Sequence, residues 1–308
     1  MESPQAVHSS LDEKGIKVRP FDQLLLIIEQ LRVKQWTKNL LIFAAAIFSI
    51  DTISSSNFAQ VFVAFLMFCF VSSCVYILND YVDREADRNH PTKRFRPMAS
   101  GALSPSVAIT IGVLLFVTSV AGAFYLSAGF GGLLLLYFVL NIAYSFKLKH
   151  IVLFDIMTIA FGFVLRAIAG GVVIEEELTP WFLLCIMLIS LFLAISKRRH
   201  EVNILDSSPS SHRKVLDQYS SELINQMSSI VTTATIICYS LFTFTSGHSL
   251  KLMWTIPLVI YGIFRYLYLI HVKGSGGSPE KILFEDKPIL MTVALYGLLT
   301  TAILFYYG

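Results

Sequence analysis

Long stretches without a charged side chain are the feature that most constrains this chain. The run from Phe58 to Leu78 contains no Asp, Glu, Lys or Arg, and neither does the run from Ser104 to Phe146. About 20 apolar residues cross a bilayer as one helix, so the second run has room for two crossings with a break at 127–132. Since 55% of the 308 residues are hydrophobic, an ordinary soluble domain is excluded. We expect an all-α integral membrane protein.

Charge-poor runs recur along the chain and predict nine transmembrane helices. Their expected bounds are 35–52, 58–79, 104–126, 131–147, 152–173, 180–197, 226–246, 252–271 and 288–307. Residues 1–20 are polar, which predicts a disordered cytoplasmic tail rather than a cleavable signal. Residues 21–34 carry apolar side chains at helical spacing, which predicts an amphipathic helix at the membrane interface; a plain extension of the first span is the alternative. Residues 35–308 then form the transmembrane catalytic domain.

The basic residues predict the orientation. If the N-terminus is cytoplasmic, all of the 24 Lys/Arg residues except Arg166, Lys251 and Arg265 lie in cytoplasmic segments. This asymmetry is what the positive-inside rule predicts for a multi-pass protein of the cell membrane. The net charge of +3 is thus topological, and we expect no nucleic-acid partner. Disulfides and zinc sites are not expected, because all four cysteines lie inside expected spans without paired spacing: Cys69, Cys74, Cys185 and Cys238.

An acidic motif stands at the end of the second expected span. Its members Asn79, Asp80, Asp83 and Asp87 form the pattern N-D-x-x-D-x-x-x-D. Steps of three, four and seven residues place the aspartates on one helical face, where like charges repel. A magnesium ion that also holds substrate phosphates would offset this repulsion, since magnesium needs only one or two carboxylates. We therefore predict the three aspartates as catalytic residues and all four side chains as metal ligands. The alternative is a solvated helix end balanced by neighbouring arginines.

The loop after the acidic motif is basic. Lys93, Arg94 and Arg96 lie between Pro91 and Pro97, which restrict the backbone. Lysine and arginine side chains donate hydrogen bonds to phosphate oxygens, and arginine does so in fork geometry. An acidic metal-binding face followed by a basic loop predicts a diphosphate site. The alternative is that these side chains are orientation signals alone.

Two further charged clusters belong to the same membrane side. Lys197, Arg198 and Glu201 close the sixth expected span, and Lys34 and Lys38 open the first. We predict that all five contact substrate. Lys197 and Glu201 are four residues apart, so an ordinary surface ion pair is the alternative for them.

Ionisable side chains also occur inside expected spans. Asp155 and Arg166 are eleven residues apart, about three helical turns, and therefore share one face. Such groups are costly in a bilayer and usually face a bundle interior or an aqueous cavity, so both are predicted to bind substrate. Tyr144 and Lys147 share a face at the end of the fourth span. Substrate binding and helix–helix hydrogen bonding are both open for this pair.

Three stretches of the sequence resemble the UbiA superfamily of membrane prenyltransferases: "RVKQWTKNLLIFAA", "NDYVDREADRNHPTKRFRPMASG" and "LRAIAGG". The resemblance extends from about residue 32 to the C-terminus. The acidic motif specifies the superfamily, and the continuation "HPTKRFRP" is similar to the branch of decaprenyl-phosphate phosphoribosyltransferases.

The resemblance implies nine helices around a central cavity that opens to the cytoplasm and to the lipid. It also implies that the motif of Asn79, Asp80, Asp83 and Asp87 binds Mg²⁺ and diphosphate. Most superfamily members carry a second aspartate-rich motif after the sixth span, where this chain has "KRRHE" at 197–201. That departure disfavours the usual prenyl diphosphate chemistry. It suits a phosphorylated sugar, whose extra 5-phosphate Lys197 and Arg198 would hold.

The expected reaction transfers 5-phosphoribosyl from phosphoribosyl diphosphate to a polyprenyl phosphate of decaprenyl type, with release of pyrophosphate. Lys34, Lys38 or Arg166 would steer the lipid phosphate, which enters from the bilayer. The resemblance further implies that the product donates arabinose-type sugars to cell-envelope glycans. The alternatives are an aromatic prenyltransferase of quinone-type biosynthesis and a transporter or lipid-binding protein. A homo-oligomer is compatible with the sequence.

Overall fold

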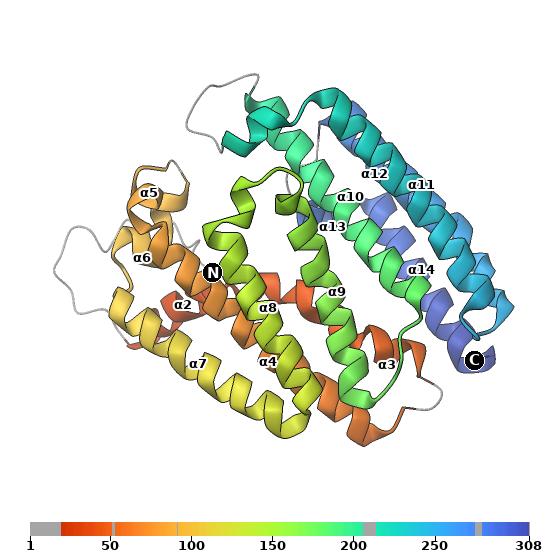
Figure 1. Cartoon of the computed structure of the whole chain (residues 1–308), viewed down its shortest axis with the longest axis horizontal. Helices are drawn as coiled ribbons and strands as arrows, with labels where there is room; N and C mark the ends of the chain where they lie inside the picture. The colour runs from red at the N-terminus through yellow and green to blue at the C-terminus, as the bar shows by residue number, and fades with distance from the viewer. Residues whose placement is uncertain (1–19, 51–52, 91, 206–213, 275–278, 308) are drawn as a thin grey trace.

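The computed structural model describes residues 20–50, 53–90, 92–205, 214–274 and 279–307, and within these ranges the protein is helical with no β-strand. The long helices run roughly alongside one another, and α4, α8 and α10 have their C-terminal ends at the same end of the bundle (Figure 1). The elements, in chain order, are α2 Pro20–Gln30, η1 Val33–Phe43, α3 Ala44–Phe48, α4 Ser55–Val82, α5 Arg84–Arg88, η2 Lys93–Phe95, α6 Pro97–Ser100, α7 Pro105–Leu126, α8 Ala128–Phe146, η3 Leu148–His150, α9 Phe154–Ile174, α10 Pro180–Leu205, η4 Lys214–Gln218, α11 Ser221–Thr245, η5 Leu250–Thr255, α12 Ile256–Lys273, α13 Pro279–Glu285 and α14 Lys287–Tyr307, where η marks a 3₁₀ helix.

Eight segments of the described chain are long and apolar enough to cross a membrane: α4, α7, α8, α9, α10, α11, η5 with α12, and α14. Each overlaps one of the expected spans. The residues at two of the helix starts explain where these helices begin. The Ser54 side chain caps α4 by accepting a hydrogen bond from the Asn57 amide at 3.1 Å, and Pro105 is the first residue of α7. The break expected at 127–132 is shorter than predicted, because Ser127 alone separates α7 from α8.

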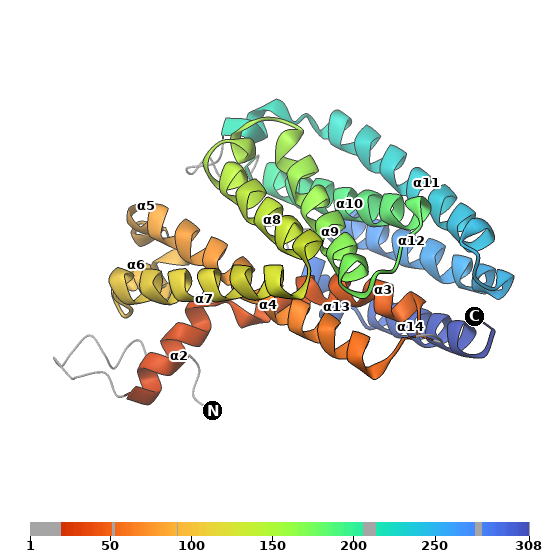
Figure 2. The same ribbon diagram turned by 60° about the horizontal axis from the view of Figure 1, so that its bottom comes forward.

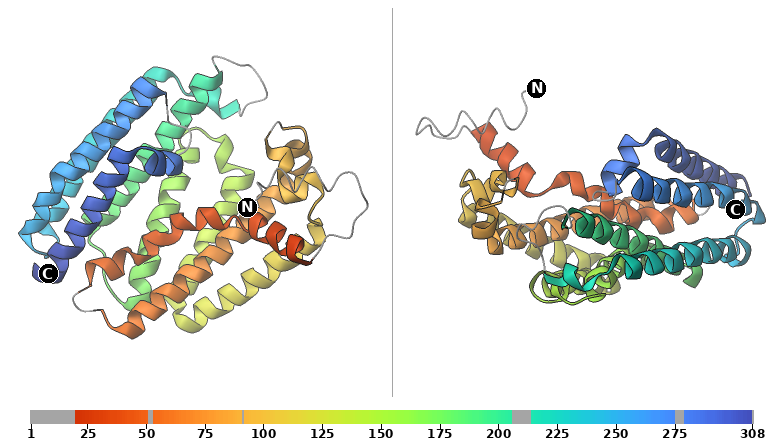
Figure 3. Two further views of the ribbon diagram at one scale, coloured as in Figure 1. Left: turned by 180° about the vertical axis from the view of Figure 1, so that it is seen from behind. Right: turned by 90° about the horizontal axis from the view of Figure 1, so that it is seen from above.

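The first expected span, 35–52, is not one long α-helix, so the count of nine is not confirmed. Its described part consists of η1 and α3, which pack against α4 and α9 (Figure 3). Because a 3₁₀ helix rises about 2.0 Å per residue, these two elements laid end to end would reach about 30 Å, the thickness of a hydrocarbon core. Tertiary hydrogen bonds from Trp36 and Asn39 to side chains of α4 hold the segment in place.

The segment predicted as an interfacial helix over 21–34 is helical as α2, and α2 leaves the bundle at a steep angle (Figure 2). Arg32 has a left-handed backbone with φ 52°, which interrupts the helix, so α2 and η1 are separate elements. Leu24, Leu25 and Ile28 form an exposed apolar row on α2. That row fits the prediction of an interfacial helix. Of the tail expected at 1–20, all but Pro20 lies outside the described residues.

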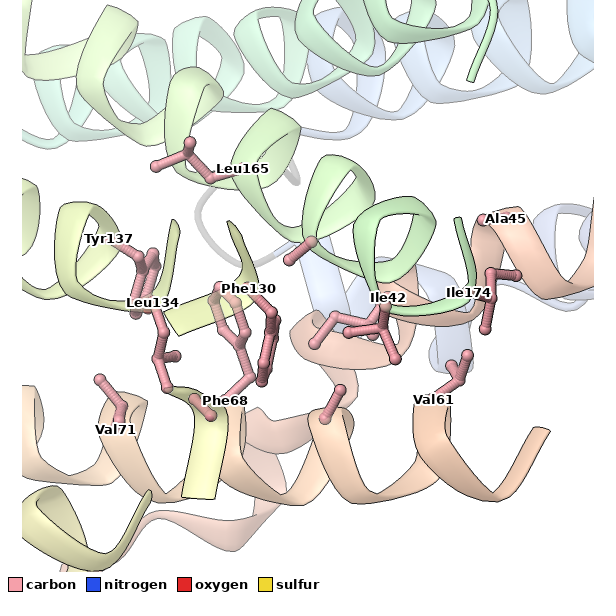
Figure 4. Close-up of a cluster of buried hydrophobic side chains, with 14 of the residues drawn as sticks. Ile42, Ala45, Val61, Phe68, Val71, Phe130, Leu134, Tyr137, Leu165 and Ile174 are labelled. Carbon is pink, nitrogen blue, oxygen red and sulfur yellow. The ribbon is translucent and has the colours of Figure 1, made fainter. Parts of the chain in front are cut away.

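The largest core lies where α4, α8 and α9 meet η1 and α3 (Figure 4). Phe68, Phe130 and Leu134 are fully buried in it, with Ile42 from η1. Gly170 of α9 makes this packing close, because a Cβ at that position would lie 1.9 Å from the Ile42 carbonyl oxygen. The core holds η1, and with it Lys34 and Lys38, in a defined place beside α4.

Candidate active site

The acidic motif lies where α4 ends, and two of its carboxylates are buried. Asp80 and Asp87 are each 3% exposed, and Arg96 joins them: its Nη1 donates to Asp80 Oδ1 at 3.0 Å and to Asp87 Oδ2 at 2.6 Å. Asp80 also accepts from Arg32 Nη2 at 2.5 Å and from Gln30 Nε2 at 2.9 Å. The expected shared face therefore exists for Asp80 and Asp87, and arginines neutralise both.

The other two motif members are placed differently. Asp83 sits at the junction of α4 and α5, with its amide bonded to the Asn79 carbonyl at 2.9 Å, and it is partly exposed. Within the described ranges, neither the Asp83 carboxylate nor the Asn79 amide group has a side-chain hydrogen bond. Their oxygens are thus available to a ligand at the end of α4.

The donor set fits a magnesium ion that brings ligands of its own. Within the part of the chain that the structure describes, no group of three or more His, Cys, Asp or Glu side chains is arranged to hold a metal. Magnesium, however, needs only one or two carboxylates beside phosphate and water oxygens. Asp83 and Asn79 offer free oxygens, and the buried Gln30 Oε1 beside Asp80 has no hydrogen-bond partner. Hard oxygen atoms therefore gather around Asp80 without forming a closed cage.

The basic loop divides into two parts. Lys93 and Arg94 lie in η2 and are exposed, and the Arg94 guanidinium stacks on Phe95 with 4.8 Å to the ring centroid. Arg96, at the end of η2, turns inward to the acidic pair instead. The two outer side chains can bind phosphate oxygens as predicted, whereas Arg96 serves the carboxylates in this structure.

A second charged cluster joins α9, α10 and the segment after η4. Asp155 is fully buried and accepts from the Tyr219 hydroxyl at 2.5 Å. Arg198, 2% exposed, donates to Glu201 Oε2 at 2.5 Å, and its Nε lies 3.4 Å from Asp155 Oδ2, an ion pair not aligned as a hydrogen bond. Three predicted site residues thus come together. The alternative for Lys197 and Glu201 was a surface ion pair; in the structure Glu201 pairs with Arg198.

Tyr219 keeps its proton at neutral pH. Burial, and next the hydrogen bond to the Asp155 carboxylate, raise the pKa of this phenol. The Tyr219 hydroxyl also accepts from the Leu153 amide at 2.9 Å, and Leu153 has a left-handed backbone with φ 68°. Tyr219 therefore ties the start of α9 to the chain before α11.

Arg166 is held by neutral partners in the bundle interior. Its Nε donates to Asn39 Oδ1 at 2.7 Å, its Nη1 to the Gly162 carbonyl at 2.7 Å and its Nη2 to the Tyr137 hydroxyl at 2.8 Å. The guanidinium also lies over the Tyr137 ring, 4.7 Å from its centroid. Arg166 joins η1, α8 and α9, whereas Asp155 of the same helix bonds to Tyr219.

The remaining predicted side chains lie at the surface of this end of the bundle. Lys34, Lys147 and Lys197 are exposed, and Lys38 and Tyr144 are half-buried. No hydrogen bond within the described ranges joins the cluster of Asp80 to that of Asp155.

Sequence reasoning missed three residues. Gln30 and Arg32 bind Asp80, and Tyr219 binds Asp155. Arg32 is the first residue of the stretch "RVKQWTKNLLIFAA", which resembles the superfamily, so its charge was a usable signal. Gln30 and Tyr219 gave no signal, because both act through chain segments that only folding brings to their carboxylates.

Comparison with known proteins places this geometry in a family. The UbiA prenyltransferase family matches residues 40–284. The chain is 33% identical to a protein of Mycolicibacterium smegmatis named decaprenyl-phosphate phosphoribosyltransferase, over 97% of this chain and 99% of that protein. A protein of the same name from Corynebacterium glutamicum is 37% identical over 87% of this chain and 83% of its own length.

Solved structures agree in fold. A UbiA homolog from Archaeoglobus fulgidus, solved bound to GPP and Mg²⁺, superposes with a TM-score of 0.68 at 19% identity over 91% of this chain and 99% of that chain. The same homolog was also solved bound to Cd²⁺, with a TM-score of 0.66. The sequence match, the long curated relatives and the shared helical architecture agree, and this chain belongs to the UbiA prenyltransferase family.

Proposed function

We propose that this protein transfers 5-phosphoribosyl from phosphoribosyl diphosphate to a decaprenyl-type polyprenyl phosphate and releases pyrophosphate. The observation that carries the proposal is the pair of relatives named decaprenyl-phosphate phosphoribosyltransferase, at 33% and 37% identity over most of the chain. The basic "KRRHE" at 197–201, in place of a second aspartate-rich motif, supports a sugar phosphate as substrate. The reaction would occur at the cytoplasmic face of the cell membrane.

The end of α4 suits the leaving group. Magnesium bound there would neutralise the charge that develops on pyrophosphate. Asp83 and Asn79 would hold the metal, with Asp80 and Asp87 as further carboxylates. The exposed Lys93 and Arg94 would bind phosphate oxygens and orient the diphosphate.

Arg32 and Arg96 share the carboxylates of Asp80 and Asp87 in this structure. Both guanidiniums have donors left over, since each arginine carries five N–H groups. They therefore hold the acidic pair in place, and their remaining N–H groups would donate to diphosphate oxygens, where negative charge grows as the C–O bond to the anomeric carbon breaks.

The second cluster suits the sugar phosphate. Lys197, which is exposed, would bind the 5-phosphate, while Arg198 is buried between Asp155 and Glu201. Asp155, Arg198 and Glu201 thus position the end of α10 and the exposed side chains on it. Lys147 and Tyr144, at the end of α8, would complete this side of the site.

The acceptor needs little activation. A polyprenyl phosphate is already anionic near neutral pH, so its oxygen can attack the anomeric carbon without a strong general base. Lys34 and Lys38 at the start of η1 would bind its phosphate, and Arg166 would hold η1 at the proper distance from α9. Attack from the face opposite pyrophosphate inverts the anomeric carbon.

Pyrophosphate release tests the proposal. The purified full-length protein is incubated with Mg²⁺, phosphoribosyl diphosphate and decaprenyl phosphate, and we expect release that requires all three. A parallel reaction replaces both substrates with a prenyl diphosphate and an aromatic acid, and here we expect no turnover. Consumption of the prenyl diphosphate contradicts the proposal, and so does the absence of pyrophosphate release with every polyprenyl phosphate length tried.

A further inference from the structure

A groove outside the candidate active site opens between α11 and α12, with a volume of about 430 Å³. α11 begins at the end of the bundle where α4 ends (Figure 1), and Arg199 of α10 reaches side chains of both α11 and α12. Farther along the two helices, Tyr239 of α11 belongs to a hydrophobic cluster against which Ile256 and Val259 of α12 pack. The two helices therefore separate toward the end that carries the charged clusters.

The α11 wall of the groove is polar. It consists of one helical face at spacings of three, four and seven residues: Asn225, Ser228, Ser229 and Thr232. The hydroxyls of Ser228 and Ser229 donate no hydrogen bond to any described residue. These small polar side chains leave donors pointing into the groove.

The wall that α12 contributes is apolar except at the end of the groove where α12 ends. It too is one helical face at the same spacings: Phe264, Leu267, Tyr268 and His271. Because α11 and α12 are antiparallel, His271 lies opposite Asn225, and Phe264 lies opposite Thr232, about two turns deeper. The groove is thus polar where the helices end and increasingly apolar toward the middle of the bundle.

A cation stands at the polar mouth. Arg199 of α10 donates from Nη1 to Asn225 Oδ1 at 2.5 Å, and the same atom lies 3.0 Å from His271 Nε2. Within the described ranges no carboxylate pairs with Arg199, unlike Arg198, Arg265 and Arg96. A half-buried guanidinium with neutral partners and spare donors attracts an anion.

The groove is separate from the candidate active site. Arg199 follows Lys197 by two residues, which on a helix is about 200° of rotation, so the two side chains point to opposite sides of α10. Arg198 is turned toward Asp155 of α9. An anion beside Arg199 would therefore not be the reacting phosphate.

We propose that the α11–α12 groove binds the phosphate headgroup of an anionic membrane phospholipid. Arg199, Asn225 and Ser229 would donate to phosphate oxygens, and a chain of the lipid would lie along Phe264 and Leu267. The combination of a cation at headgroup depth with an apolar wall below it matches the shape of an amphiphile. Basic pockets between transmembrane helices are known places for anionic headgroups.

A ligand titration tests this site without an activity readout. Short-chain phosphatidylglycerol is added to the detergent-purified full-length protein, and the unfolding temperature is followed. We expect a saturable rise with phosphatidylglycerol and a much smaller rise with phosphatidylcholine of the same chain length. An equal rise with phosphatidylcholine overturns the proposal, and so does an equal rise with inorganic phosphate alone.

Variants locate the effect. R199Q should weaken the phosphatidylglycerol response about tenfold, because it removes the charge from a hydrogen bond to phosphate. R84Q, a neutral replacement of another half-buried arginine at the same end of the bundle, is the matched control and should leave the response unchanged. An R199Q protein that responds like the wild type overturns the proposal.

A second variant covers the case in which R199Q does not fold. S229W fills the groove from an exposed position and leaves Arg199 in place. We expect it to abolish the phosphatidylglycerol response, and a normal response overturns the proposal. A polyprenyl phosphate is the final competitor: if it displaces phosphatidylglycerol from the groove at lower concentration, the site belongs to the lipid substrate and the proposal is wrong.

Discussion

At the residue scale, Asp83 is the most informative member of the acidic motif. Asp80 and Asp87 are buried and bound to arginines, so their replacement disturbs folding as well as any chemistry. Asp83 is partly exposed and has no side-chain partner among the described residues. A change at this position therefore separates metal binding from stability.

We expect D83N to lower pyrophosphate release at least about a hundredfold, because it removes a magnesium ligand at the diphosphate. Its unfolding temperature should stay close to that of the wild type, as for other surface substitutions. E85Q is the control, since Glu85 is an exposed acid that pairs with Arg84 and Arg88, and it should retain full turnover. A fully active D83N enzyme would remove Asp83 from the proposed metal site.

At the element scale, the contact between α9 and η1 depends on one glycine. A Cβ at Gly170 would meet the Ile42 carbonyl oxygen at 1.9 Å, and backbone cannot move aside as a flexible side chain can. We expect G170A to destabilise the protein by about 2 kcal/mol or more. G132A in α8 is the matched control, because nothing lies within 4 Å of its added methyl.

Thermal unfolding in detergent checks this pair of variants. G132A should be neutral or stabilising by about 0.5–1 kcal/mol, since alanine is the better helix former. Equal unfolding temperatures for G170A and the wild type would mean that η1 and α9 can move apart at little cost.

Asp286 joins α12 to α14. Arg265 donates to it from Nε at 3.2 Å and from Nη2 at 2.8 Å, and the Ile289 amide donates to Asp286 Oδ1 at 3.0 Å, as at the start of a helix. The hydrogen bonds from Arg265 lower the pKa of Asp286 below its usual value of 3.8. The stability that this carboxylate contributes is therefore present above that value and lost as the pH falls through the lower folded pKa.

We expect D286N to lower the unfolding temperature at neutral pH and to converge with the wild type as the pH falls from about 5 to about 2. D286A should cost about 1 kcal/mol more than D286N, because asparagine can still cap α14 and alanine cannot. A difference between D286N and the wild type that persists unchanged at low pH would show that charge is not the cause.

At the scale of the whole molecule, the arrangement of the spans predicts which loops face the cytoplasm. Arg84 lies beyond the end of α4, and Lys251 lies in η5 at the opposite end of the bundle. The four native cysteines should react little with a thiol label, because all of them are buried: Cys69, Cys74, Cys185 and Cys238.

We expect a membrane-impermeant maleimide to label K251C in intact cells. R84C should be labelled after the membrane is opened and not before. The reverse pattern would place the candidate active site outside the cell and contradict both the orientation and the proposed substrates.

Much of this architecture could be predicted from the chain alone. Charge-poor runs are long enough to reveal eight spans, because the cost of burying a charge in lipid keeps most Asp, Glu, Lys and Arg side chains out of them. The motif around Asp80 was visible for a related reason: its charges stand out against an apolar background. The 3₁₀ path of η1 was not predicted, since its bonds to α4 and α9 override local periodicity.

The pairing of charges required the folded molecule. Sequence spacing puts Asp80 and Asp87 on one face, but their partners Arg32 and Arg96 come from segments on either side of the motif. Tyr219 reaches Asp155 across 64 residues of chain. The spacing of apolar residues along a helix shows which of its faces meets lipid and which meets protein. The neighbours that hold a buried charge lie on other helices, so tertiary packing selects them.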